Sequence, residues 1–376
     1  MKKEKNKIKL SDIITTVVLF AVGAAIGFFA FRFGLNSVDE TGDFNLAAFL
    51  LQAAVLIASI YIGVAFHIIA HEAGHLIGGL ACGYKFTSFR VYHIIFVKED
   101  GKIKTKRYNI AGAAGQCLMT PPEPVNGKFP YLLYNLSGGV ANLMFGGIFF
   151  ALYTLFNFSY AGIIFIPLAG IGVLLGLTNL IPLKMSGIAN DGYNIMLMSK
   201  NERARSAFYT MLMVNASLTE GVRYKDMPPE WSELPEDFND PISVTIAINR
   251  MNVSIDNHDF TAAKELAQRI LNEGSKILEI YKNELRCELL FLEIIGERRP
   301  EEIERLYTKN LAKYIKASGS QMSKRRLMYA YHKLVTRDEA ETVKALKMYE
   351  KVRLAYPYKG ELELERELIE IIDGIT

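Results

Sequence analysis

The residues with the clearest capacity for chemistry are His71, Glu72 and His75, which form the pattern H-E-x-x-H. Residues four apart on a helix project from the same face, so the two imidazoles can reach one metal ion. Glu72 projects about 100° around the helix from His71, which places its carboxylate beside that ion rather than on it. In this arrangement two histidines hold zinc and the glutamate is the general base for a zinc-bound water. The spacing therefore predicts part of a hydrolytic zinc site.

The stretch that contains this pattern, residues 46–80, is apolar enough to lie in a lipid bilayer. A pattern with three fixed positions also arises by chance in soluble helices, where it is only structural. In a bilayer that alternative is expensive, because an ionisable group at membrane depth costs about 2.5 kcal/mol or more unless it pairs or binds something. The setting therefore favours metal binding.

Four segments are long and apolar enough to span a membrane: residues 14–34, 46–81, 131–156 and 162–183. The second is too long for a bilayer at about 1.5 Å per residue, so it must tilt, bend or protrude. Charged residues are sparse in the first part of the chain and dense after Lys200. The composition predicts a mainly α, polytopic membrane protein with a soluble C-terminal part.

Lysine and arginine predict the orientation of these spans, because cytoplasmic loops are enriched in both. The amino end is basic, the link after the first span is acidic, and the loop after the second span is basic again. Four spans in a cell membrane, with both termini in the cytoplasm, satisfy this pattern. The first span has no small-residue cleavage site, so we expect an anchor rather than a removed signal peptide.

A catalytic zinc site normally needs a third protein ligand. The end of the fourth span carries Asn179-Leu180-Ile181-Pro182, and Asp191-Gly192 follows. An H-E-x-x-H helix followed by N-x-x-P and D-G resembles the site-2 protease family of intramembrane zinc metalloproteases, over residues 46–193. The resemblance implies Zn²⁺ as cofactor and Asp191 as its third ligand. It also implies that Asn179 and Pro182 belong to the segment that binds substrate.

The chain departs from the family in one spacing. The aspartate usually follows the asparagine of N-x-x-P after eight positions, whereas Asp191 lies twelve beyond Asn179. The extra residues, within 183–190, would have to loop out. The alternative third ligands are Glu123, Glu202 and His67, of which His67 is expected to support or pack against the site rather than bind metal.

A stretch of small residues in the third span, Ser137 to Asn142, is also similar to the family. Gly138, Asn142 and Gly146 recur every four residues and predict a smooth stripe for close helix packing. Gly74 with Gly78, and Gly172 with Gly176, repeat this pattern in the second and fourth spans. Asn142 is therefore a candidate for substrate binding, and helix packing is the alternative.

Between the second and third spans the pattern becomes strand-like. Residues 86–97 predict one strand, Glu99-Asp100-Gly101 a turn, and residues 102–110 a return strand. The edge of such a hairpin could hold an extended substrate. An ordinary cytosolic hairpin is the alternative.

The rest of the chain predicts a soluble C-terminal domain. We expect an amphipathic helix over residues 193–219 and a linker in the proline-rich stretch 226–241. A membrane core would then occupy residues 1–225 and a helical domain residues 242–376. Apolar pairs at a spacing of forty residues suggest helical repeats, which commonly bind peptides, although a plain helical bundle would fit too. The pairs are Ala263 with Leu266, Ile303 with Leu306, and Val343 with Leu346.

These features together predict a zinc endopeptidase that cuts peptide bonds in or near membrane segments. Its partners would be a membrane-embedded protein or peptide substrate, the lipid bilayer and a cytosolic partner of the tail, and no nucleic-acid signature is present. A silent membrane scaffold that acts through the tail is the alternative from a different class. The three cysteines lack ligand spacing and are expected to pack.

Overall fold

The computed structural model describes residues 28, 37–38, 42–110, 112–156, 160–185, 188–236, 238, 241–274 and 277–375. The predicted first span, 14–34, lies outside the described residues except for Phe28, and so does the lysine-rich amino end. The chain divides into two compact units: Met1–Gly78 with Leu132–Met196, and Gly79–Tyr131 with Leu197–Thr376.

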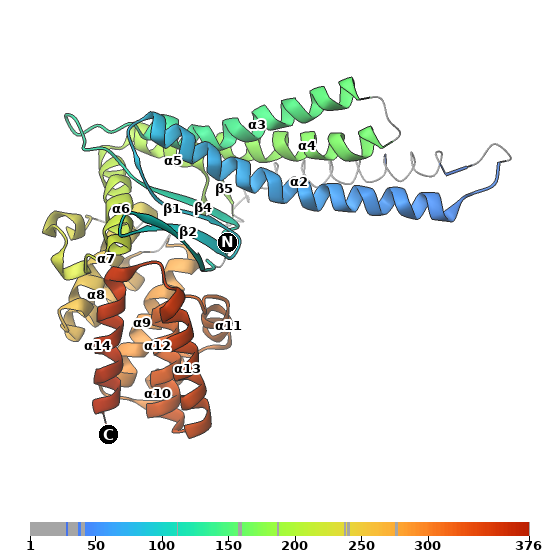
Figure 1. Ribbon diagram of the computed structural model, residues 1–376. Helices are drawn as coiled ribbons and strands as arrows, with labels where there is room; N and C mark the ends of the chain where they lie inside the picture. The colour runs from blue at the N-terminus through green and yellow to red at the C-terminus, as the bar shows by residue number, and fades with distance from the viewer. Residues whose placement is uncertain are drawn as a thin grey trace, which may run out of the picture. The chain divides into compact units, whose positions relative to one another are not determined.

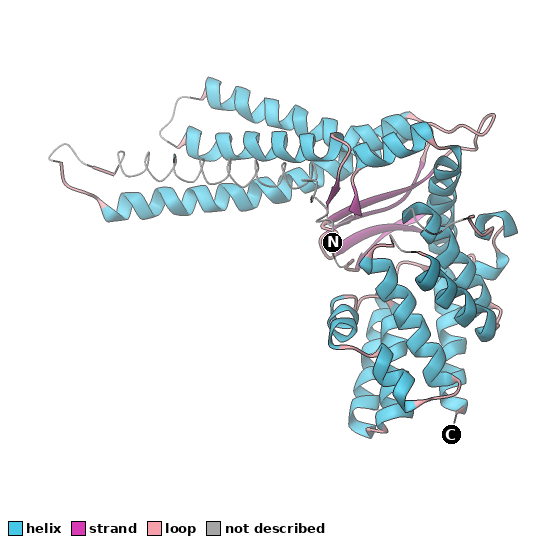
Figure 2. Ribbon diagram, turned by 180° about the vertical axis from the view of Figure 1, so that it is seen from behind, coloured by secondary structure: helices cyan, strands magenta, loops and turns pink. Residues whose placement is uncertain are grey.

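The first unit is built on three long helices, α2 (Leu46–Ala81), α3 (Tyr131–Leu155) and α4 (Ala161–Leu180). They lie side by side in Figure 1 and Figure 2. Within the described part of the chain, these are the helices long and apolar enough to cross a membrane. Many of their large apolar side chains are exposed, Ile62 by 63% and Ile77 by 68%, as expected for helices whose outer faces meet lipid. The predicted second, third and fourth spans are thus confirmed as helices of spanning length.

Glycines allow these helices to approach one another closely. A Cβ atom on Gly74 of α2 would lie 2.3 Å from the Ser137 carbonyl oxygen of α3, and one on Gly176 of α4 would lie 2.9 Å from the Gly139 carbonyl oxygen. Such contacts are too short for any larger residue. The predicted small-residue stripes therefore lie at helix contacts, where small side chains let the backbones meet.

The second unit contains a four-stranded antiparallel sheet of order β3-β2-β1-β4. Its strands are β1 (Lys85–Val91), β2 (Ile94–Glu99), β3 (Lys102–Arg107) and β4 (Gly115–Thr120). The prediction of one strand over 86–97 was wrong, because the chain reverses at Tyr92-His93 and pairs Val91 with Ile94. The turn at Asp100-Gly101 is confirmed, with φ values of 53° and 76° that suit a tight two-residue hairpin. Strand β4 was not predicted.

Helices form the rest of this unit. They are α6 (Glu202–Glu220), α7 (Pro241–Asp256), α8 (Phe260–Glu273), α9 (Glu279–Ile295), α10 (Pro300–Leu306), α11 (Lys309–Ala317), α12 (Met322–Ala330), α13 (Glu339–Ala355) and α14 (Lys359–Gly374). The predicted single helix over 193–219 is two helices, α5 (Asp191–Lys200) and α6. The break falls at Asn201, which is extended and caps α6 by accepting a hydrogen bond from the Ala204 amide.

The described residues of the proline-rich stretch 226–241 include several that pack within the second unit. The stretch includes a short 3₁₀ helix, Pro229–Ser232, and Met227 and Trp231 contact a cluster formed with Val214 of α6. The sheet joins the same unit, since Ile95 and Tyr108 pack with the helical residues Met322, Tyr349 and Tyr356. The two compact units are divided at other positions in the chain, and the domain boundaries at 225 and 241 remain a prediction.

The spacing of forty residues matches helix starts at Phe260, Pro300 and Glu339. Ala263 and Ile303 are buried near the starts of α8 and α10, whereas Val343 of α13 is 53% exposed. Helix α10 has 7 residues and α13 has 17. The helices thus share a spacing but not a length or a burial pattern, and the repeat remains a prediction.

Candidate metal centre

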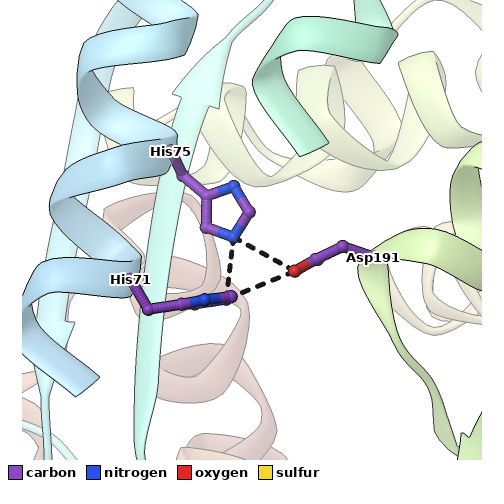
Figure 3. Close-up of side chains that lie close together, drawn as sticks. All are labelled: His71, His75 and Asp191. Carbon is purple, nitrogen blue, oxygen red and sulfur yellow. Dashed lines mark hydrogen bonds and ion pairs between the residues drawn. The ribbon is translucent and has the colours of Figure 1, made fainter. Parts of the chain in front are cut away.

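His71 and His75 lie one turn apart on α2, and their side chains point toward the start of α5, where Asp191 lies (Figure 3). The Nε2 atoms of the two histidines are 3.0 Å apart. Asp191 Oδ2 lies 3.2 Å from His71 Nε2 and 3.4 Å from His75 Nε2. Three candidate ligand atoms from two distant parts of the chain therefore converge on one point.

This triangle has the dimensions of a metal site. Ligands about 2.0–2.1 Å from a tetrahedral ion lie about 3.3 Å from one another, close to the three distances observed. Asp191 Oδ2 is buried, and apart from its contacts with the two imidazoles it has no hydrogen-bond partner among the described residues. Burial alone raises the pKa of Asp191, but its interactions with His71 and His75 lower it well below the ordinary value. An ionised carboxylate beside two imidazoles is a fitting donor set for a divalent cation.

The position of Asp191 depends on the residues on either side of it. The Asn190 side chain accepts hydrogen bonds from the amides of Leu183 and Tyr193, at 3.1 and 2.8 Å. It also donates to the carbonyls of Thr178 and Ile181 near the end of α4. These bonds hold together the two ends of the loop over residues 183–190, which contains the extra residues between Asn179 and Asp191. Within this loop, β5 (Lys184–Met185) pairs with β6 (Ile188–Ala189).

Gly192 completes this arrangement. A Cβ atom there would lie 2.2 Å from the Leu180 carbonyl oxygen, so only glycine lets α5 begin this close to the end of α4. Asp191 thus returns to the histidines despite its longer spacing from Asn179. The roles of Asn190 and of the close contact between Gly192 and the Leu180 carbonyl were not predicted from the sequence. The signal available was an asparagine immediately before a helix start, a preferred N-cap residue.

Backbone and side-chain contacts orient both imidazoles. His75 Nδ1 donates a hydrogen bond to the Tyr134 carbonyl of α3 at 2.7 Å, which leaves the lone pair of Nε2 free for a metal. Helix α3 comes this close because residue 138 is glycine: a Cβ atom there would lie 2.5 Å from His75 Nε2.

Asn142 lies between two histidines of α2. Its side-chain amide is 3.2 Å from His67 Nδ1 and 3.4 Å from His71 Nδ1. His67 Nε2 donates to the Leu168 carbonyl at 2.9 Å, so in neutral His67 the Nδ1 atom must accept. In the structure Asn142 Oδ1 faces His67 Nδ1 and Nδ2 faces His71 Nδ1. A half-turn of the amide would let its nitrogen donate to His67 Nδ1 and its oxygen accept from His71 Nδ1–H, and this orientation is the one that frees His71 Nε2 for a metal.

The other predicted residues lie as follows. Glu72 is buried on α2, 8% exposed, and is not part of the ligand group. The Asn179 amide nitrogen donates to the Leu175 carbonyl of its own helix at 2.9 Å, and Pro182 is exposed. His67 is fully buried and outside the ligand group, which agrees with its expected supporting role.

The other two alternatives for the third ligand, Glu123 and Glu202, are not part of the ligand group. Glu123 is exposed, and Glu202 is exposed and pairs with Arg205 of its own helix. Both belong to the second unit, whereas the three grouped residues belong to the first. Cys82, Cys117 and Cys287 are free and contribute nothing to this group.

No protein-family model, no curated protein and no solved structure matches this chain. The interpretation of the centre therefore rests on its own geometry and donor chemistry.

Proposed function

We propose that this chain is a membrane zinc endopeptidase of the site-2 protease type, which hydrolyses peptide bonds within or next to membrane segments of protein or peptide substrates. The observation that supports it most is the convergence of Asp191 with His71 and His75, which lie with Glu72 on a helix apolar enough to cross a bilayer. Ionisable side chains inside an apolar helix bundle cost free energy unless they pair or bind something, and such residues usually mark a functional site.

The donor set favours zinc. Two imidazoles and one carboxylate are three protein ligands, the number that catalytic zinc sites use while keeping one position open. When bound, zinc supplies a Lewis acid that polarises the scissile carbonyl and makes water a nucleophile near neutral pH. His71, His75 and Asp191 would hold the ion, and the Tyr134 carbonyl and Asn142 amide fix the imidazole orientations.

Glu72 is the proposed general base and acid. It follows His71 directly on α2, so its carboxylate projects beside the ligand group. There it takes a proton from the attacking water and delivers it to the leaving amine. Its burial keeps this proton transfer away from bulk solvent.

The substrate must be extended before it is cut, because a helix shields its own peptide carbonyls. We assign Asn179 and Pro182, at the end of α4, to substrate binding, and Asn142 to positioning, since its amide contacts His67 and His71.

The proposed location is a cell membrane with both termini in the cytoplasm. The bilayer and a membrane-embedded substrate are then the partners of the first unit, and the second unit would face the cytosol. A silent scaffold would need none of the ligand geometry, which is why we place it second.

Replacement of Glu72 by Gln tests the proposal. The variant removes the base and leaves every ligand in place, so it should retain zinc and cleave at least about 100-fold more slowly. Zinc content is measured on the purified full chain, and uncut substrates are sought in membrane proteomes of cells carrying either form. Glu297→Gln, at an exposed position in the second unit, is the control. Near-normal cleavage by Glu72→Gln would exclude Glu72 from the mechanism, and absence of zinc from the unaltered chain would exclude the proposed function.

A further inference from the structure

A cavity of about 280 Å³ lies in the second unit, and most of its lining residues belong to helices α6, α7, α9, α12 and α14. All of its lining residues belong to that unit, so it shares none with the metal centre. It is near the lower end, about 300 Å³, of pockets that bind small molecules. At about 30 Å³ per water it has room for about nine waters, or for one small polar group.

The cavity wall carries more negative than positive groups. Four glutamates line it: Glu284 and Glu288 of α9, and Glu361 and Glu365 of α14. Two buried cations compensate part of this charge. Lys324 pairs with Glu284, and Arg326 Nη2 donates to Glu288 Oε2 at 2.6 Å. Both cations are thus already engaged by the α9 carboxylates.

The α14 carboxylates are less well compensated. Glu361 accepts hydrogen bonds from the hydroxyls of Tyr224 and Tyr356, at 2.8 and 2.5 Å, but pairs with no cation within the described ranges. Glu365 Oε1 is 3.6 Å from Arg326 Nη1, and its Oε2 has no hydrogen-bond partner among the described residues. Burial raises the pKa of Glu365 to about 7, because the nearby Arg326 offsets the loss of hydration only in part.

Further buried polar atoms on the same wall also lack partners among the described residues. They are the acceptor Gln321 Oε1 and the donors Asn249 Nδ2 and Arg326 Nε. Asn249 is 8% exposed and Glu365 is 4% exposed, so bulk water reaches neither freely. Buried polar groups are nearly always hydrogen-bonded in native proteins, and each exception needs an explanation. With Glu365 Oε2, the wall thus offers two acceptors and two donors to a ligand.

We infer that this cavity binds the cationic end of a peptide, meaning an ammonium or guanidinium group next to an amide carbonyl. The cation donates to Glu365 Oε2 and Gln321 Oε1, and the carbonyl accepts from Asn249 Nδ2. A bound cation also keeps Glu365 ionised in its low-polarity surroundings. Both an N-terminal α-ammonium group and a basic side chain have this chemistry.

Calorimetric titration of the purified full chain in detergent distinguishes a peptide N-terminus from a basic side chain as the source of the cation. The probes are glycylglycinamide for the peptide terminus, Nα-acetyl-lysinamide for the side chain, putrescine for a free amine, and acetylated glycylglycinamide as the neutral control. At least one of the two peptide cations should bind at least about tenfold more tightly than the neutral control, because hydrogen bonds to charged partners are the stronger ones. It should also bind more tightly than putrescine, which offers no carbonyl to Asn249. Equal affinity for the neutral control, tighter binding of putrescine, or no binding of any probe would overturn the inference.

Substitutions in the cavity wall test whether the peptide cation binds in this cavity. Glu365→Gln keeps the size and removes the charge, and should weaken the favoured peptide cation at least about tenfold. Glu370→Gln, on the same helix but with a side chain 62% exposed, should change nothing. Asn249→Leu provides an independent reading, since it should weaken the carbonyl-bearing cation and leave putrescine unaffected. Unchanged affinity of the peptide cation in a folded Glu365→Gln or Asn249→Leu protein would place the ligand elsewhere.

Discussion

At the residue scale, the chemistry of the centre depends on which imidazole nitrogens carry protons. His75 is fixed by a backbone carbonyl, which can only accept. His71 is fixed by Asn142, whose orientation is in turn set by His67 and the Leu168 carbonyl. A chain of polar contacts therefore runs from the backbone of α4 through His67 and Asn142 to Nδ1 of His71, whose Nε2 faces His75 and Asp191.

Asn142→Leu should break this chain. His71 would lose the acceptor for its Nδ1–H, and partners of this kind are worth about 10–100-fold in metal affinity. Asn142→Asp should lose less, because a carboxylate still accepts from His71. Chelator competition for zinc measures both, with circular dichroism to verify folding. An Asn142→Leu protein with unaltered zinc affinity would show that Asn142 serves packing or substrate only.

Asp191 allows a direct test of the ligand set. Asp191→Ala should lower zinc affinity at least about 100-fold, since two imidazoles form an incomplete site. Asp191→Asn should be less severe, because the amide oxygen is a neutral and poorer donor. Zinc content after dialysis reports both. Full retention of zinc in Asp191→Ala would require another third ligand and would contradict the observed geometry.

Much of this site could be predicted because its strongest signal is local. His71, Glu72 and His75 lie within five positions, where helical periodicity alone determines their directions. Asp191 required a resemblance, since no local rule connects residues more than a hundred positions apart. Asn190 and the Tyr134 carbonyl escaped prediction for a related reason: a cap and a backbone acceptor show their partners only once the helices are packed.

At the element scale, glycine sets the distance between α3 and the histidines. Gly138→Ala would put a Cβ atom 2.5 Å from His75 Nε2 and 2.7 Å from His71 Cε1, so an imidazole or the helix must move. We expect loss of most of the bound zinc. Gly147→Ala on the same helix is a matched control, because a Cβ atom there meets nothing within 4 Å.

The control should keep zinc and gain about 0.5–1 kcal/mol of helix stability, the usual difference between alanine and glycine. Thermal unfolding and zinc content distinguish the two variants. Equal zinc content in both would mean that the site tolerates a wider helix spacing than the close contacts imply.

The strands show where periodicity fails as a guide. Residues 86–97 are continuously rich in aromatic and β-branched side chains, so nothing in the apolar pattern marks the reversal at Tyr92-His93. Asp100-Gly101 was recognisable, since two successive positive φ angles favour this dipeptide. A turn built on a bulky residue such as Tyr92, with φ at 52°, has no comparable signal.

At the scale of the whole molecule, the division into units cuts across the order of the sequence. Proline and acidic residues predicted a linker at 226–241, because prolines interrupt regular structure. Proline also fits 3₁₀ turns that pack, and Met227 and Phe238 in this stretch are 9% and 1% exposed. The composition of a segment shows which regular secondary structures it cannot form. The burial of its side chains depends on residues that are distant in the sequence.

This division changes what truncation should do. The ligands of the metal centre and the contacts that orient them lie in the first unit, so a chain ending at residue 240 should still bind zinc. The sheet should not survive as a compact structure, because Ile95 and Tyr108 would lose Met322, Tyr349 and Tyr356 from their core. Limited proteolysis should then cut within residues 85–120 of the truncated chain and spare the same residues of the full chain. A truncated protein with a protected sheet would mean that the first 240 residues fold alone, and one without zinc would mean that the second unit is needed to hold the centre together.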